Sequence, residues 1–274
     1  ATRLREGPEG VRKILRAIFR LAPIPIRDLA RDLGIPVPVV AAVRGELEKR
    51  KLATRDFGLA LTEAGVAILK DAVGIASAEQ YTIVSVAPLP ESVASLVSVF
   101  ADIAARRPSV DVSLDQSHAT AETAIRRAMY LFEHDAIEGR SILFLGDDDL
   151  TSIAVGLLST HLGIAPARMT VLDTDERLIS FLGKSSATPT FIEPLHHDLR
   201  NAIPEELHGQ FDVFFTDPPY TTEGLRLFSG RGVGALRQEV GKKGFVSFGH
   251  KSPQETVEIG RVFAELALGV VEAV

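Results

Sequence analysis

Apolar positions in the first seventy residues recur with a helical period and then with a short extended pattern. Between residues 11 and 21 they fall every three or four positions, and Pro23 and Pro25 follow directly. Gly34 ends the next helical pattern. The spacing predicts helices over 11–21, 26–33 and 38–51, extended pieces over 52–55 and 59–61, and a helix that begins at Thr62.

Three helices followed by a small hairpin resemble the winged helix-turn-helix family over residues 10–70, and we expect this domain to occupy 1–80. Its third helix carries Arg44 and the basic run 49–51, which would suit DNA binding. The alternative is a structural or dimerising module whose charges are solvated. A net charge of +4 over residues 1–80 is small for a DNA-binding domain, so the second interpretation is favoured.

A connector is expected over 81–118, with a candidate strand at 81–87 and a helix over 91–106. Thr120 is the predicted N-cap of a helix that runs through Phe132. From residue 119 onward, short apolar runs alternate with helical patterns. The predicted strands are 141–145, 169–172, 190–193, 211–216, 244–248 and 269–274, and the predicted helices are 151–162, 175–182, 222–239 and 253–267.

This alternation is typical of a doubly wound, Rossmann-like α/β domain with a mostly parallel sheet, which we assign to 119–274. In such a domain, ligands bind beyond the carboxyl ends of the strands. The residues that directly follow each predicted strand are therefore the candidates for chemistry.

Composition describes an ordinary globular chain of 274 residues, with 46% apolar and 24% charged residues. No run is long and apolar enough for a membrane span, and no leader is evident, so a cytoplasmic protein is expected. The lack of cysteine excludes disulfides and thiolate zinc sites. The absence of cysteine and tryptophan together with abundant arginine and glutamate favours a thermophilic source.

The net charge of −6 is divided unevenly. Residues 1–80 carry +4, and the remaining residues carry −10. An acidic body repels nucleic acid and attracts polycations.

The first predicted strand of the sheet is followed by Gly146 and three aspartates, Asp147, Asp148 and Asp149. A dinucleotide-binding loop needs glycines and a positive helix start, and three carboxylates would repel a pyrophosphate. The loop instead suits a cationic ligand such as a sulfonium or an amine. Gly146 and Asp147 are the candidates to bind such a cofactor.

Two later strand ends also carry carboxylates. Asp173 follows the second strand, where an acidic side chain can accept both ribose hydroxyls of a nucleoside. After the third strand, Asp198 is a candidate acceptor for an adenine amino group, with the backbone of Leu199 beside it. The adjacent histidines 196 and 197 do not converge on one point, so no metal site is predicted.

The apolar run 211–216 ends in Asp217-Pro218-Pro219-Tyr220. Prolines have a fixed φ and no N–H group, so the carbonyls before them, including that of Pro218, are rigidly directed. A carboxylate, rigid carbonyls and an aromatic ring at one strand end suit the binding of an amine. Together with the acidic loop 146–149, this segment predicts an enzyme that alkylates a nitrogen atom.

Gly146, Asp173, Asp198 and Asp217 have the order and spacing of a class I S-adenosylmethionine-dependent methyltransferase, which residues 120–274 resemble. Asp-Pro-Pro-Tyr alone resembles the amino-methyltransferases of nucleic acids, and this function is the alternative reading. The charge of −10 over residues 81–274 disagrees with it, because a polyphosphate substrate needs basic contacts. A third reading is a DNA-binding regulator whose sheet domain senses a nucleoside.

Nearly the whole chain resembles the branched-chain polyamine synthases, or N(4)-bis(aminopropyl)spermidine synthases. The matching segments are 115–116, 119–120, 122–123, 145–152, 171–178, 197–200, 211–221 and 244–250. The resemblance implies decarboxylated S-adenosylmethionine as donor and spermidine as acceptor, with the aminopropyl group passing to the central secondary nitrogen. A homodimer is expected, and nucleic acid is a less favoured partner.

With that substrate, Asp149 is expected to be the main base, because burial and neighbouring carboxylates raise the pKa of a carboxyl group towards a useful range. Asp148 and Asp217 are expected to bind the amine, and Tyr220 to pack on it through a cation–π contact. The residues expected to bind the outer amines are Asp115, Glu122 and Glu223, with Gln116 on the aminopropyl amine of the donor. In comparison with the family, this sequence is expected to lack the last strand and the C-terminal tail, which would follow residue 274.

Overall fold

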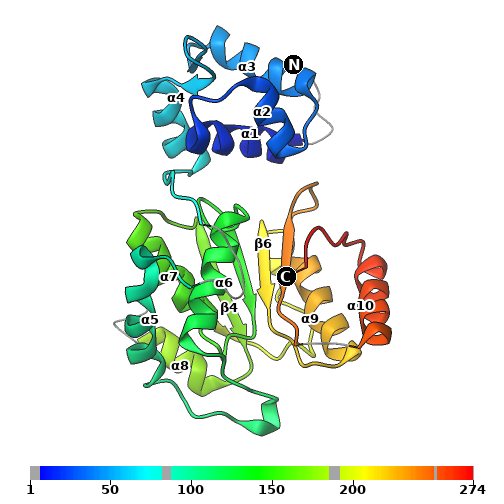
Figure 1. Cartoon of the computed structure of the whole chain (residues 1–274). Helices are drawn as coiled ribbons and strands as arrows, with labels where there is room; N and C mark the ends of the chain where they lie inside the picture. The colour runs from blue at the N-terminus through cyan, green and yellow to red at the C-terminus, as the bar shows by residue number, and fades with distance from the viewer. Residues whose placement is uncertain (1–6, 82–87, 185–191, 250–251, 274) are drawn as a thin grey trace. The chain divides into compact units, whose positions relative to one another are not determined.

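A computed structural model describes residues 7–81, 88–184, 192–249 and 252–273. The chain divides into two compact units (Figure 1). The first comprises Ala1–Gln80 with the short segments Leu162–Ala165 and Glu239–Gly241, and the second comprises the remainder. No helix in the described residues is long and apolar enough to cross a membrane.

The first unit is built from short helices and one small antiparallel sheet. Its elements are α1 (Gly7–Leu21), α2 (Ile26–Leu33), α3 (Val37–Lys49), β1 (Ala53–Thr54), β2 (Ala60–Leu61) and α4 (Glu63–Ile68). Its core includes Ile14, Ile18, Leu29, Val40 and Leu59. The order of three helices and a strand pair matches the prediction from the sequence, whereas the identification as a winged helix stays a prediction.

Two local signals explain where helices of this unit end and begin. Gly34 closes α2 in the left-handed conformation, with φ 64°, and its N–H group bonds to the carbonyls of Ala30 and Arg31. Thr62 begins α4, because its hydroxyl accepts a hydrogen bond from the N–H group of Gly65 at 3.1 Å.

The second unit is an α/β domain with a parallel sheet. Its helices are α5 (Glu91–Ala104), α6 (Ala121–Glu133), α7 (Thr151–Leu162), α8 (Glu176–Lys184), α9 (Thr222–Ala235) and α10 (Pro253–Glu265). Its strands are β3 (Ser141–Leu145), β4 (Arg168–Asp173), β5 (Ile192–His196), β6 (Val213–Thr216) and β7 (Lys243–Val246). They are ordered β5-β4-β3-β6-β7 and every neighbouring pair is parallel.

Because β4 and β5 extend from one side of β3, and β6 and β7 from the other, the strand order reverses at β3. All five carboxyl ends lie at the same edge, and the loops after β3 and β6 are neighbours there. This is the place where a Rossmann-like sheet binds its ligands.

Helix α9 covers one face of the sheet. Leu143, Leu145 and Phe214 belong to one apolar cluster that also contains Ala235 of α9. Phe144 and Phe215 alternate with those residues and their rings lie 6.1 Å apart on the other face. Figure 1 shows α9 beside the strands and α10 on the outer side of α9, in agreement with the packing of α9 on both.

One predicted strand is absent, one predicted helix ends early, and one candidate strand lies outside the described residues. Residues 269–273 form no strand, and Val270 and Val271 are 63% and 97% exposed because no described strand pairs with them. Helix α9 ends at Ala235 instead of 239, since Leu236 is extended and the chain there pairs with Phe211. The candidate strand 81–87 falls outside the described residues except for Tyr81.

Candidate active site

The loop after β3 is built around a glycine in a conformation that other residues adopt only with strain. Gly146 has φ +71°, and its N–H group bonds to the carbonyl of Leu172 in β4 at 2.9 Å. The chain can therefore turn sharply at the strand end and carry the three aspartates back over the sheet edge before α7 begins.

Asp147 fastens this loop to its surroundings. The hydroxyl and N–H groups of Ser152 donate to its carboxylate at 2.5 and 3.1 Å, and its own N–H group donates to Asp173 at 3.0 Å. Burial raises the pKa of Asp147 well above its usual value. Asp147 is thus a structural support of the loop, and its carboxylate is already occupied.

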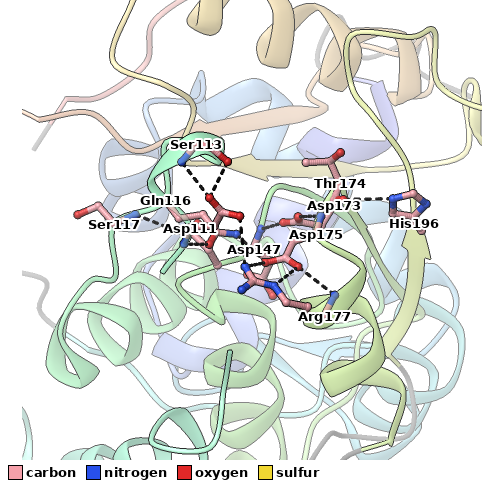
Figure 2. A network of polar contacts seen from close by, with 11 residues as sticks. Asp111, Ser113, Gln116, Ser117, Asp147, Asp173, Thr174, Asp175, Arg177 and His196 are labelled. Carbon is pink, nitrogen blue, oxygen red and sulfur yellow. Dashed lines mark hydrogen bonds and ion pairs between the residues drawn. The ribbon is translucent and has the colours of Figure 1, made fainter. Parts of the chain in front are cut away.

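Asp173, at the end of β4, lies at the centre of a polar network that Figure 2 shows from close by. Its two carboxylate oxygens accept from the N–H groups of Asp147 and Asp175, at 3.0 and 2.8 Å. Burial raises the pKa of Asp173 even though these hydrogen bonds oppose the rise. The role of Asp173 as a ribose-binding carboxylate stays a prediction.

The next part of the network connects Gln116 to the start of α8 (Figure 2). The amide nitrogen of Gln116 donates to Asp175 at 3.1 Å, and its oxygen accepts from the N–H group of Asp111 at 2.8 Å. Arg177 forms an ion pair with Asp175 at 2.7 Å and, with Gln116, lowers the pKa of Asp175 to about 2. The segment around Gln116 is therefore anchored beside the carboxyl end of β4.

Asp148 and Asp149 differ in their partners although they are adjacent. The Asp148 carboxylate accepts from the N–H group of Ser117 at 3.1 Å, and its carbonyl accepts from the guanidinium of Arg107 at 3.2 Å. Burial together with the charge of Asp149 raises the pKa of Asp148 to about 7. Asp149 is 4% exposed, and its two oxygens accept from the N–H group of Ala119 and from the guanidinium of Arg127. The two adjacent carboxylates therefore differ in their hydrogen bonds, and the raised pKa of Asp148 lies near neutral pH.

Arg127 is the residue that the sequence analysis missed. From α6 it donates to Asp149 and to Asp217, both at 2.5 Å, and to the hydroxyl of Ser247 at 2.8 Å. The sequence did contain a signal, because the neighbouring positions 124, 125, 128 and 129 are all apolar, and the structure buries them. A charged side chain at the margin of such a helix face needs a partner.

Asp217 follows β6 and reaches the same cluster. Its Oδ2 accepts from Arg127, while its Oδ1 is buried and has no hydrogen-bond partner in the described part of the chain. Burial raises the pKa of Asp217 against the opposing attraction of Arg127. Of the adjacent residues, Pro218 is buried, whereas Tyr220 is 52% exposed and stacks on Phe248 with ring centroids 5.8 Å apart.

The remaining predicted residues are not joined to this cluster by any hydrogen bond or ion pair in the described chain. Asp198 is paired with Arg200 at 2.6 Å, which lowers its pKa to about 2, and Leu199 is buried in the apolar cluster beneath α9. The three outer carboxylates are exposed, and one of them is paired with Arg126; they are Asp115, Glu122 and Glu223. Among the described residues no group of three His, Asp or Glu side chains is placed to hold a metal ion.

A parallel sheet with this strand order and with carboxylates at its switch point defines a Rossmann-like domain of the class I methyltransferase type. The chain belongs to the branched-chain polyamine synthase family: the model of the branched-chain polyamine synthase A C-terminal domain matches residues 95–272. The resemblance found in the sequence is thereby confirmed.

Several relatives support this membership. An uncharacterized protein of Methanocaldococcus jannaschii is 36% identical over 98% of this chain and 68% of its own length. The N(4)-bis(aminopropyl)spermidine synthase of Thermococcus kodakarensis is 33% identical over 77% of this chain, and the match spans only 60% of that enzyme. The branched-chain polyamine synthase of Thermus thermophilus, in complex with N4-aminopropylspermidine and 5′-methylthioadenosine, has a TM-score of 0.56 and 27% identity over 93% of this chain and 72% of its own.

Proposed function

We propose that this protein transfers the aminopropyl group of decarboxylated S-adenosylmethionine to the secondary amine of spermidine, giving branched products such as N(4)-bis(aminopropyl)spermidine. The observation that carries the proposal is the cluster of Asp148, Asp149 and Asp217 at the carboxyl edge of the sheet. Family membership and the ligands of the Thermus thermophilus enzyme support the same reaction.

The chemistry is a displacement at the carbon bonded to the sulfonium sulfur. The lone pair of the amine forms a new C–N bond while the C–S bond breaks, and its electron pair stays on sulfur. The leaving product is 5′-methylthioadenosine, the compound bound in the Thermus thermophilus complex. Because little other bond chemistry is required, alignment of the two substrates provides most of the acceleration.

On the donor side, we assign the nucleoside to the ends of β4 and β5. The proposed nucleoside site is lined by Gly146, Asp147 and Asp173. Asp173 is the proposed acceptor of hydrogen bonds from the ribose hydroxyls. Asp198 and the backbone of Leu199 remain the proposed contacts of the adenine. Binding there would require Asp198 to share its carboxylate with Arg200, which it contacts in the free protein.

On the acceptor side, charge and desolvation favour a polyamine. Spermidine is a polycation, and the second unit offers several carboxylates that burial has already removed from water. Tyr220, stacked on Phe248, presents an aromatic surface for an ammonium group. Asp115, Glu122 and Glu223 are the proposed contacts for the terminal amines, since all three are exposed.

The amine must lose a proton before it can attack. The sequence favoured Asp149 as the base, but both of its carboxylate oxygens already accept hydrogen bonds, from Ala119 and Arg127. Asp148 has a pKa of about 7, and its carboxylate accepts from one donor among the described residues, the N–H group of Ser117. We therefore assign proton acceptance to Asp148, and assign to Asp149 and Asp217 the binding of the ammonium.

A paired turnover assay tests the function. The protein and spermidine are incubated at elevated temperature with either decarboxylated or ordinary S-adenosylmethionine, and the amines are measured by mass spectrometry. We expect mass increases in aminopropyl steps with the decarboxylated donor alone. Absence of any polyamine product with both donors would reject the proposal, and methylation of a nucleic acid by ordinary S-adenosylmethionine would support the alternative.

A further inference from the structure

The two carboxylates at the ends of β3 and β6 share one counter-ion. Asp149 and Asp217 contact different nitrogens of the Arg127 guanidinium, each at 2.5 Å, and the same guanidinium donates to Ser247 after β7 at 2.8 Å. Three loops at the sheet edge are therefore joined through a single side chain that originates in α6.

We propose that Arg127 is a positioning residue of this site: it fixes Asp149 and Asp217 as an ionised pair and leaves one oxygen of Asp217 directed at the substrate amine. The identity of that amine rests on the proposed function. Arg127 is not required to touch the substrate, because it acts through the two carboxylates.

Burial makes this contact strong. The exposed fractions of the Arg127, Asp149 and Asp217 side chains are 15%, 5% and 17%. Two carboxylates so close to each other and so poorly hydrated do not both remain ionised without a cation. The guanidinium also lies 5.7 Å from the ring centroid of Phe215, which is a favourable place for a desolvated cation.

The shape of the guanidinium explains why the residue is arginine. It offers donors in a planar fork, so one side chain can hold two carboxylates at a fixed separation. A lysine ammonium has the same charge but is a compact point charge without this fork. Charge alone therefore does not reproduce the contact.

The hydrogen bonds also identify which oxygen is left for a ligand. Both oxygens of Asp149 have donors, from Ala119 and Arg127, and Oδ2 of Asp217 is held by Arg127. Oδ1 of Asp217 is buried and has no partner among the described residues. Since a buried acceptor without a donor is costly, a ligand ammonium that donates to Oδ1 would relieve this cost.

Asp217 is surrounded by groups that influence its titration. Arg127 from α6 favours its charged form, whereas Asp148 and Asp149 from the loop after β3 oppose it. The hydroxyl groups of Tyr220 and Ser247 also interact with the Asp217 carboxylate. Because Arg127 is the only positive charge among these neighbours, its removal would raise the pKa of Asp217 further.

The experiment compares Arg127→Gln, Arg127→Lys and the control Arg168→Gln. Arg168 resembles Arg127 in having an ion pair, with Glu193 at 2.8 Å, and an aromatic contact, with Phe211, but it lies at the opposite end of β4. The measurements are kcat/KM for the acceptor against pH, and the titration of Asp217 followed by 13C NMR of its carboxyl carbon in the free protein.

For Arg127→Gln we expect a loss of about a hundredfold in kcat/KM for the acceptor at neutral pH, with partial recovery at higher pH as Asp217 ionises again. The midpoint of the Asp217 titration should rise by about one unit or more. Arg127→Lys should shift the midpoint less than Arg127→Gln, yet lose activity because it lacks the fork. The control should leave both measurements unchanged.

An unchanged Asp217 titration in Arg127→Gln would overturn the proposal, as would a pH profile equal to that of the wild type. The NMR measurement needs no turnover, so it distinguishes a failure of this inference from a failure of the proposed polyamine reaction. If Arg127→Gln does not fold, the folded Arg127→Lys variant decides: wild-type values for both its titration midpoint and its kcat/KM would overturn the proposal.

Discussion

Asp212 is a buried carboxylate of the second unit whose charge is stabilised by several partners. Its carboxylate accepts from Arg237 at 2.6 Å, from Lys242 at 2.9 Å and from the N–H group of Ser141 at 3.0 Å. Burial would raise its pKa, but these contacts outweigh burial and lower the pKa to about 2. Arg107 lies near Asp148 and donates to its carbonyl at 3.2 Å, but no ion pair to the Asp148 carboxylate forms among the described residues, and the pKa of Asp148 moves in the opposite direction.

Replacement of Asp148 by Asn should remove the group that accepts the proton of the amine. We expect kcat to fall by about a hundredfold or more, within the range that general base catalysis contributes. The acidic limb of the wild-type pH profile, with a midpoint near the pKa of about 7, should disappear. Steady-state kinetics from pH 5.5 to 9 check both points, and a variant that keeps this limb would show that another group is the base.

The matched variant Asp149→Asn should behave differently, since Asp149 is paired with Arg127. Its main effect should be a higher KM for the acceptor, because the ammonium loses part of its counter-charge. If Asp149→Asn abolishes the acidic limb and Asp148→Asn does not, the assignment of the base reverts to Asp149.

Replacement of Asp212 by Asn should lower the free energy of unfolding by about 2 kcal/mol at pH 7, because the buried ammonium of Lys242 loses one of its charged contacts. The pKa in the folded protein lies below that of an unfolded Asp, about 3.9. The stabilisation is therefore complete above about pH 4 and is lost as the pH falls towards 2. Urea unfolding at pH 7 and pH 3 should show a difference between wild type and variant that shrinks at the lower pH; a constant difference would contradict this explanation.

At the scale of elements, α9 and β7 approach β6 closely because glycines leave room for one ring. A Cβ atom added at Gly232 would lie 2.6 Å from the ring of Phe214, and one added at Gly244 would lie 2.3 Å from it. Phe214 is fully buried in the cluster beneath α9. These two glycines therefore set the distance between the helix and the strands that carry Asp217 and Ser247.

Gly232→Ala should destabilise the protein by about 1–3 kcal/mol, since overpacking against Phe214 exceeds the gain in helix propensity. Gly260→Ala is the control within α10, where an added Cβ meets no atom within 4 Å. That variant should be stabilised by up to about 1 kcal/mol. Thermal unfolding of both variants checks the pair, and equal effects of the same sign would argue against the close approach.

At the scale of the whole molecule, charge separates the two parts of the chain. Residues 1–80 carry a small positive charge, whereas the rest carries −10. A field of this sign concentrates cations near the carboxyl edge of the sheet and repels polyphosphates. It is also weakened by salt, because charges more than a Debye length apart are screened.

The KM for the polyamine should therefore rise severalfold between about 0.05 M and 0.5 M salt, while kcat changes little. Initial rates over a range of sodium chloride concentrations measure this dependence. The KM for the donor, which carries fewer charges, serves as the internal comparison. A KM for the acceptor that does not depend on salt would show that the acidic surface does not assist binding.

Local patterns in the sequence were enough to predict most elements and the place of the site. The strand 141–145, the helix 151–162 and the cap at Thr120 were predicted correctly, because apolar periodicity and capping depend on neighbouring residues. The carboxylates at strand ends could be grouped because parallel strands bring their carboxyl ends to one edge.

The tertiary structure alone decided which charges meet and where some elements end. Arg127 lies 90 residues from Asp217, so no local pattern joins them, and its contacts change which aspartate we propose as the base. Helix α9 stops at Ala235 because the chain beyond it pairs with Phe211, and residues 269–273 form no strand because a strand needs a neighbour. Apolar periodicity determines whether a segment can form a helix or a strand. Tertiary burial and neighbouring charges determine the pKa and the contacts of each side chain.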